Sequence, residues 1–369
     1  MNAQITKIDS NVISSLRMPL AFLVVLWHAC GYGMIADQTM SFTNGLFDTI
    51  KILFSEGICI ISVPIFFVIS GFLFEAHFCR CQWSFCNYKE YIIKKLARLV
   101  VPYLLWNVIF LVAFYLLKLA GDFIETGSVN YSFCEYVGEN KGFQLFAYGN
   151  EGFPINYPLW FVRDLIIVNL LYPILYFLNQ YSGGGILLII NLLYIASSAV
   201  SVPRFIPLEA ISFFFVGMYL KRNVKVLDVL EGRNKYWILV LSIMTVCLLL
   251  VATLSYGNNN ILYGISSKLL VYSFSPIVIH ALYRYYEIGE KNKPMNNIAS
   301  KSFFVYAVHA IILGYICAAI GKFTHIDSQV LNVVIYFIVA IATFAISLFS
   351  YKILNKFSPV FISILTGGR

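Results

Sequence analysis

Residues 236–256, YWILVLSIMTVCLLLVATLSY, contain no charged side chain and are long enough for a helix to cross a bilayer, which takes roughly 20 residues. The chain has ten apolar stretches in all, some shorter and some with isolated charged residues, at 11–32, 50–75, 99–120, 158–179, 185–201, 206–220, 236–256, 261–284, 302–320 and 329–351. Charged residues make up 12% of the 369 residues and hydrophobic residues 60%. The composition excludes a soluble enzyme, a disordered chain and a fibrous repeat, since soluble domains have about 25% charged residues. It predicts one all-α domain over 1–369, a polytopic membrane bundle with no appended soluble domain.

The basic residues are distributed unevenly between the two sides of this bundle. With the N-terminus inside, the inner segments and the span ends facing them hold 19 of the 26 Lys and Arg residues, whereas the outer loops hold three. Because Lys and Arg accumulate on the cytoplasmic side of membrane proteins, we predict that both termini lie inside. The same asymmetry accounts for most of the net charge of +8, so the charge does not indicate nucleic-acid binding.

The predicted loops contain one acidic segment and one cysteine cluster. The outer loop 121–157 includes Asp122, Glu125, Glu135, Glu139 and Glu151. It either covers a site or is a solvated loop without a chemical role. On an inner segment, Cys79, Cys81 and Cys86 have a spacing that matches no pair of zinc knuckles, so we expect no metal site.

The first span contains Arg17 and, eleven residues later, His28. Eleven helical steps turn about 1100°, close to three full turns, so both side chains lie on one face about 16.5 Å apart along the axis. Arg17 lies near the inner end and His28 lies past the midplane, towards the outside. The pair either accommodates a long thin ligand or consists of a snorkelling arginine and a structural histidine.

Two further stretches lie at the inner membrane surface. In residues 64–72, PIFFVISGF, Ser70 can donate a hydrogen bond and Gly71 allows another helix to approach closely. Lys95 and Arg98 are three residues apart, share a helical face, and are suited to binding phosphate. Helix packing and a basic membrane anchor are the simpler explanations of these two stretches.

Ionisable side chains inside a membrane are energetically unfavourable and mark functional sites. Six of them lie at similar depth in the outer halves of their spans: His28, Glu56, Arg163, Asp164, Glu209 and Lys268. We therefore expect a polar outer chamber, with Trp160 sharing a face with Asp164 four residues later. Arg163 and Asp164 are adjacent and should point apart, so we expect their partners on other helices.

The ninth span contains Tyr306 and His309, three residues apart. Their side chains therefore face one direction, which we place in the inner half of the membrane. His309 is either a second base or a structural or ligand-lining residue.

In their order and spacing, these stretches resemble the acyltransferase type 3 family of integral-membrane O-acyltransferases, from residue 11 to about 350. The motifs that carry the resemblance are Arg17-x10-His28, FFVISG at 66–71, Lys95-Leu-Ala-Arg98, Trp160-Phe161 and Tyr306-Ala-Val-His309. The resemblance implies transfer of an acyl group, often acetyl, from cytosolic acyl-CoA to a hydroxyl of a carbohydrate or related envelope molecule. It implies a multi-pass protein of a bacterial inner membrane with no permanently bound cofactor and with His28 as the main catalytic residue.

The expected site combines this resemblance with the depth of each residue. We expect Asp164 or Glu209 to orient His28, which acts either as a general base or through an acyl-imidazole intermediate. The expected acyl-CoA-binding residues are Arg17, Ser70, Lys95, Arg98, Tyr306 and His309. The expected acceptor-binding residues are Glu56, Trp160, Arg163 and Lys268. The sequence indicates no particular oligomeric state.

A transporter or flippase for a glycan or lipid-linked intermediate is the alternative. Charges inside the membrane and the short spans at 185–201 and 206–220, with Pro203 and Pro207 nearby, also fit a transporter. The shared face of Arg17 and His28, together with the inner pair Lys95 and Arg98, favours the acyltransferase, because a transporter does not require this combination.

Overall fold

The computed structural model describes residues 7–29, 45–81, 83–128, 132–139, 152–181, 184–200, 202–223, 235–288, 301–323 and 328–368. The long helices are α1 (Lys7–His28), α4 (Ser62–Cys81), α5 (Phe85–Thr126), α7 (Trp160–Tyr181), α11 (Lys235–Ser255), α12 (Asn260–Ile288), α14 (Ser302–Phe323) and α15 (Gln329–Phe357). The shorter elements are α3 (Leu46–Lys51), η1 (Ile52–Ile58), η2 (Cys59–Ile61), α6 (Phe133–Glu139), η5 (Tyr157–Leu159), α8 (Gly184–Ala196), α9 (Leu208–Arg222) and α16 (Pro359–Leu365). The described residues contain no strand, so the all-α prediction is confirmed.

All ten predicted spans coincide with helices. Eight helical stretches of the described chain are long and apolar enough to cross a membrane. The other two positions are occupied by α8, with 13 residues, and α9, with 15 residues. A polytopic helical membrane protein is thereby confirmed. The count of ten crossings and the inside location of both termini stay predictions.

The predicted inner segment 76–98 is helical over most of its length. Helix α4 continues to Cys81, and α5 begins at Phe85 after an N-cap in which Ser84 accepts a hydrogen bond from the backbone N–H of Asn87. With 42 residues, α5 is about 63 Å long, roughly twice the thickness of the hydrocarbon core. Hydropathy marks only the apolar part of this helix, so its basic first turns were not included in the predicted span.

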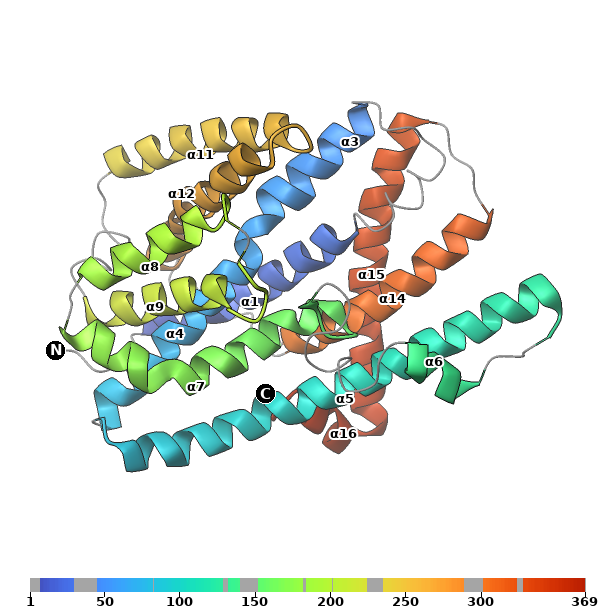
Figure 1. Ribbon diagram of the computed structural model, residues 1–369, viewed down its shortest axis with the longest axis horizontal. Helices are drawn as coiled ribbons and strands as arrows, with labels where there is room; N and C mark the ends of the chain where they lie inside the picture. The colour runs from blue at the N-terminus through green and yellow to red at the C-terminus, as the bar shows by residue number, and fades with distance from the viewer. Residues whose placement is uncertain are drawn as a thin grey trace.

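Helix α1 lies inside the bundle, where it packs against α4, α12, α14 and α15. Figure 1 shows α5 along one edge of the molecule with α16 beside it, and α11 and α12 at the opposite edge. The C-terminal end of α1, which carries His28, is therefore surrounded by helices from distant parts of the sequence.

Two glycines allow α4 and α9 to cross at close range. A Cβ atom on Gly71 would lie 2.0 Å from the carbonyl oxygen of Phe214, and one on Gly217 would lie 2.0 Å from that of Val68. Each glycine thus admits the backbone of the other helix, as small residues do at membrane helix contacts. The predicted close approach at Gly71 is confirmed, and it fixes the position of the FFVISG motif.

Candidate active site

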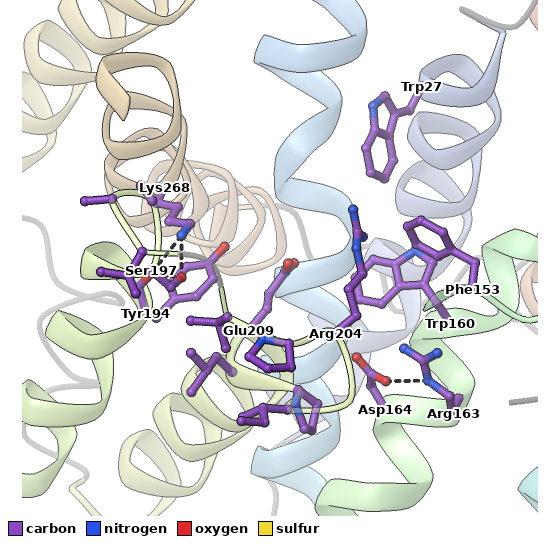
Figure 2. A pocket seen from close by; sticks show the side chains of 18 residues that line it. Trp27, Phe153, Trp160, Arg163, Asp164, Tyr194, Ser197, Arg204, Glu209 and Lys268 are labelled. Carbon is purple, nitrogen blue, oxygen red and sulfur yellow. Dashed lines mark hydrogen bonds and ion pairs between the residues drawn. The ribbon is translucent and has the colours of Figure 1, made fainter. Parts of the chain in front are cut away.

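A cavity of about 720 Å³ occupies the region where the polar outer chamber was predicted. We call it the outer cavity. Among its lining residues are Trp27, Phe153, Trp160, Arg163, Asp164, Tyr194, Ser197, Arg204, Glu209 and Lys268. Figure 2 shows Tyr194, Ser197 and Lys268 on one side, Trp27, Phe153 and Trp160 on the other, and Glu209 between them. Four of the six predicted chamber residues, Arg163, Asp164, Glu209 and Lys268, thus line one space.

The expectation that Arg163 and Asp164 point apart is wrong. Arg163 Nε donates to Asp164 Oδ1 at 2.9 Å, and Arg163 Nη1 donates to the carbonyl oxygen of Gly152 at 2.7 Å. The arginine side chain is long enough to reach the carboxylate of its sequence neighbour. Both side chains are largely buried, so the pair is shielded from water.

Lys268 is held in place by the C-terminal end of α8. Its Nζ donates to the carbonyl oxygen of Tyr194 at 2.8 Å and to Ser197 Oγ at 2.7 Å, and lies over the Tyr194 ring. A cation at this position also interacts favourably with the helix dipole. Lys268 therefore presents a fixed positive charge at one side of the outer cavity.

Glu56 was expected to contact the acceptor directly, but it does not line the outer cavity. Its Oε1 accepts a hydrogen bond from Trp27 Nε1 at 3.3 Å, and its Oε2 accepts one from Tyr263 OH at 2.7 Å. The indole of Trp27 lines the cavity, so Glu56 lies behind this part of the wall.

His28 is the last residue of α1 and lies against three rings. Its imidazole stacks on the ring of His309, with centroids 5.2 Å apart, and on that of Trp27 at 5.1 Å. Tyr157 contacts it edge-on at 4.9 Å. The two histidines therefore share one level, whereas the sequence analysis placed them in opposite halves of the membrane.

The expected contact between His28 and a carboxylate is absent among the described residues. The Oδ1 of Asp164 accepts a hydrogen bond from Arg163 instead, and Glu209 lines the cavity without a hydrogen bond to His28. His28 stacks on His309 instead, and the distance between these two residues in the sequence gave no sign of this pairing.

His309 is fully buried and its tautomer is fixed. Its Nδ1 donates to the carbonyl oxygen of Tyr306 at 2.6 Å, which leaves Nε2 as a hydrogen-bond acceptor. Among the described residues, Nε2 has no hydrogen-bond partner. Since buried polar atoms are normally paired, this nitrogen is available to a ligand or to water.

A second cavity of about 380 Å³, the inner cavity, lies beside the FFVISG motif. Arg17, Ser70, Lys95 and Tyr306 line it, so it gathers four of the six predicted acyl-CoA-binding residues. The charged side chains in its lining are Arg17 and Lys95, both basic. Hydroxyl groups of Ser14, Ser70 and Ser302 accompany them.

Arg98 does not line the inner cavity, although it was expected to act together with Lys95. Its side chain is exposed, while Lys95 is half-buried over the rings of Phe74 and Tyr91. Three helical steps leave the two side chains about 60° apart around α5. The chain end packs on the backbone at this point, since a Cβ on Gly367 would lie 2.2 Å from the carbonyl oxygen of Arg98.

Helix α7 separates the two cavities. Trp160, Arg163 and Asp164 line the outer cavity, and Phe161, Val162 and Leu165 line the inner one. Phe161 packs on the rings of Phe67, Phe66 and Tyr306, at 4.7, 5.7 and 5.8 Å. The aromatic motif thus builds a wall, and the stacked pair His28–His309 adjoins it.

Of the predicted outer loop, residues 129–131 and 140–151 lie outside the described part of the chain, and with them Glu151. Phe153, near the end of that loop, lines the outer cavity. Whether the acidic segment covers the site stays a prediction.

Glu75, Tyr172 and Arg222 form a buried ionic group that was not predicted from the sequence. Glu75 is fully buried, accepts a hydrogen bond from Tyr172 OH at 2.9 Å, and is paired with Arg222. The pair joins α4, α7 and α9. An acidic residue at the end of the second predicted span was the available signal.

Comparisons with known proteins agree with this architecture. The acyltransferase domain family matches residues 12–352. The chain is similar to the succinoglycan biosynthesis protein ExoH of Rhizobium meliloti (strain 1021), with 24% identity over 336 residues that cover 88% of this chain and 84% of that protein. No solved structure matches the chain.

Proposed function

This chain belongs to the acyltransferase type 3 family, and from that premise we propose that it transfers an acetyl group from acetyl-CoA to a hydroxyl of a polysaccharide. The similarity to a succinoglycan biosynthesis protein supports a polysaccharide acceptor. The eight long apolar helices of the described chain are consistent with the bacterial inner-membrane location that is part of this proposal. One observation carries the proposal: the stacked His28–His309 pair contacts residues of both a basic cavity and a cavity of mixed charge. Trp27 of the outer cavity stacks on His28, and Tyr306 of the inner cavity accepts a hydrogen bond from His309, whereas neither histidine lines a cavity itself.

In this proposal, acetyl-CoA occupies the inner cavity. Arg17 and Lys95 bind its phosphates, and the serine hydroxyls of the lining donate further hydrogen bonds. The continuous helix from Arg17 to His28 spans about 16.5 Å, a length suited to the extended pantetheine arm. The thioester then lies near His28, and the free Nε2 of His309 accepts a hydrogen bond from an N–H of the arm.

The transfer step uses His28 as the proton acceptor. The acceptor hydroxyl attacks the thioester carbonyl while its proton moves to the imidazole, a contribution worth about 10²–10⁴-fold in rate. Collapse of the tetrahedral intermediate forms the ester, breaks the C–S bond and releases the CoA thiolate, which takes the proton from the imidazolium. The alternative route passes through an acetyl-imidazole that the hydroxyl attacks in a second step.

The acceptor occupies the outer cavity in this proposal. The rings of Trp27 and Trp160 in its wall are suited to packing on the apolar face of a sugar. The Glu209 carboxylate and the fixed Lys268 ammonium offer hydrogen bonds to hydroxyl groups. The largely buried Arg163–Asp164 pair supplies both signs of charge on the α7 side.

The test uses the purified full-length protein in lipid nanodiscs with acetyl-CoA and a panel of polysaccharide fragments that includes succinoglycan. We expect release of the CoA thiol together with a mass increase of one acetyl group on at least one fragment. His28→Ala should abolish both signals. Transport is measured separately with the same protein in sealed proteoliposomes. Protein that consumes no thioester but moves a labelled glycan across the vesicle bilayer would refute the acyltransferase and establish the transporter.

A further inference from the structure

The last turn of α1 is fixed by hydrogen bonds from other parts of the bundle. The carbonyl oxygen of Leu26 accepts a hydrogen bond from Tyr336 OH at 3.0 Å, and this hydroxyl is also 2.8 Å from Ser55 Oγ. The next residue, Trp27, donates through Nε1 to Glu56. Two consecutive residues of α1 are thus held by Ser55 and Glu56, directly or through Tyr336.

Ser55 and Glu56 belong to η1, a π-helical segment over Ile52–Ile58. Such segments are rare and often occur at functional sites. Here three consecutive residues contact three separate partners: Ser55 contacts Tyr336, Glu56 contacts Trp27, and Gly57 lies against Leu249, where a Cβ would be only 2.4 Å from its Cδ1. The wider turn thus directs the Glu56 carboxylate towards α1.

The Glu56 carboxylate is held from both sides. One oxygen accepts from Trp27 Nε1 and the other from Tyr263 OH of α12, at 2.7 Å. The indole N–H of Trp27 is therefore bound to a carboxylate whose position is fixed by Tyr263. The indole face stacks on His28, with an interplanar angle of 27°, while the same residue lines the outer cavity.

We propose that Glu56 is a positioning residue that acts through Trp27. It fixes the indole so that the outer cavity adjoins His28 in the geometry needed by the acceptor hydroxyl. This inference rests on the proposed acyltransferase function and replaces the direct contact with the acceptor that the sequence predicted. A mobile indole would leave the inner cavity intact and disturb only the approach from the outer cavity.

The experiment compares Glu56→Leu, Glu56→Gln, Trp27→Phe and the double variant Glu56→Leu/Trp27→Phe. Kinetics use acetyl-CoA and the fragment that the wild-type protein acetylates fastest. We expect Glu56→Leu to lower kcat/KM for the fragment about tenfold and to leave the KM for acetyl-CoA unchanged, because a hydrogen bond to a charged group is lost. Glu56→Gln keeps an acceptor oxygen and should restore most of this loss.

The double variant separates positioning from general destabilisation. Trp27→Phe removes the indole N–H, so Glu56→Leu should add little further effect in that background. Ser62→Ala, which removes a buried hydrogen bond to the carbonyl oxygen of Cys59 in the adjoining η2, is the control for destabilisation. Additive effects of Glu56→Leu and Trp27→Phe, or an equal rise in the KM for acetyl-CoA, would overturn the proposal.

A spectroscopic measurement tests the contact itself. The protein has five tryptophans, and the indole N–H signal of Trp27 in ¹⁵N-tryptophan-labelled protein is identified by its loss in Trp27→Phe. Glu56→Leu should shift and broaden this signal, and Glu56→Gln should shift it less. An unchanged signal, or full transfer activity in Glu56→Leu, contradicts the positioning role of Glu56 and leaves the proposed acyltransferase function standing. A wild-type protein without transfer activity contradicts the proposed function instead.

Discussion

The inner and outer cavities differ in the charge of their walls. The charged side chains lining the inner cavity are Arg17 and Lys95, whereas the outer cavity has Arg163, Asp164, Arg204, Glu209 and Lys268. A wall whose charged side chains are all basic suits an anionic ligand such as a CoA phosphate. A wall with both signs of charge and with aromatic rings suits a ligand with many hydroxyl groups. The difference supports the proposal that the two cavities bind ligands of unlike chemistry, a CoA thioester and a carbohydrate.

The largest expected effect comes from a substitution between the cavities. His28→Ala should lower the rate of acetyl transfer by at least about 100-fold, because it removes the general base. Binding of acetyl-CoA, measured by calorimetry, should change little, since His28 does not line the inner cavity. Wild-type turnover in this variant would remove His28 from the chemistry.

A substitution in the inner cavity should affect the donor alone. Arg17→Gln should raise the KM for acetyl-CoA about 10- to 100-fold through loss of charged hydrogen bonds to phosphate. The KM for the fragment should stay unchanged. Dephospho-CoA tests which phosphate is involved, and an equal rise in both KM values would contradict the division between the cavities.

A substitution in the outer cavity should have the opposite selectivity. Trp160→Ala should raise the KM for the fragment about tenfold, because a ring that packs on the sugar is lost. The KM for acetyl-CoA should be unaffected. Trp237→Ala on α11 is the matched control, since this tryptophan lines neither cavity. Loss of donor affinity in Trp160→Ala would show that α7 transmits changes between the cavities.

The smallest effect is expected at Arg98. Its exposed side chain lies outside the inner cavity, so Arg98→Gln should change the KM for acetyl-CoA by less than about twofold. Lys95→Gln, three residues earlier, is the comparison and should raise the KM for acetyl-CoA more strongly. Equal losses in the two variants would place the nucleotide further along α5 than the inner cavity extends.

Properties that depend on one helix were predictable from the sequence. The shared face of Arg17 and His28 follows from the helical repeat, and α1 is continuous between them. Apolar length alone located every helix of the predicted spans. The first turns of α5 were not predicted, because their lysines lower the hydropathy on which the spans were identified.

Properties that depend on two or more elements were not predictable in the same way. The rotation of α5 that exposes Arg98 depends on how the other elements pack around it, and Glu56 faces Trp27 because of the π-helical turn. The stacking of His28 on His309 joins residues that are far apart in the chain. The prediction that Arg163 and Asp164 point apart was wrong for a local reason, because it neglected the length of the arginine side chain.

The paired glycines at the crossing of α4 and α9 also restrict how this protein can diverge. Any side chain at Gly71 or Gly217 meets main-chain atoms of the opposite helix, which cannot move aside as a side chain would. In a deep mutational scan, both positions should therefore tolerate almost no replacement. The outer-cavity residues at the start of α9 lie at the other end of this rigid unit and should accept many substitutions without loss of folding. Such a division lets acceptor preference drift during evolution while the frame of the bundle is conserved.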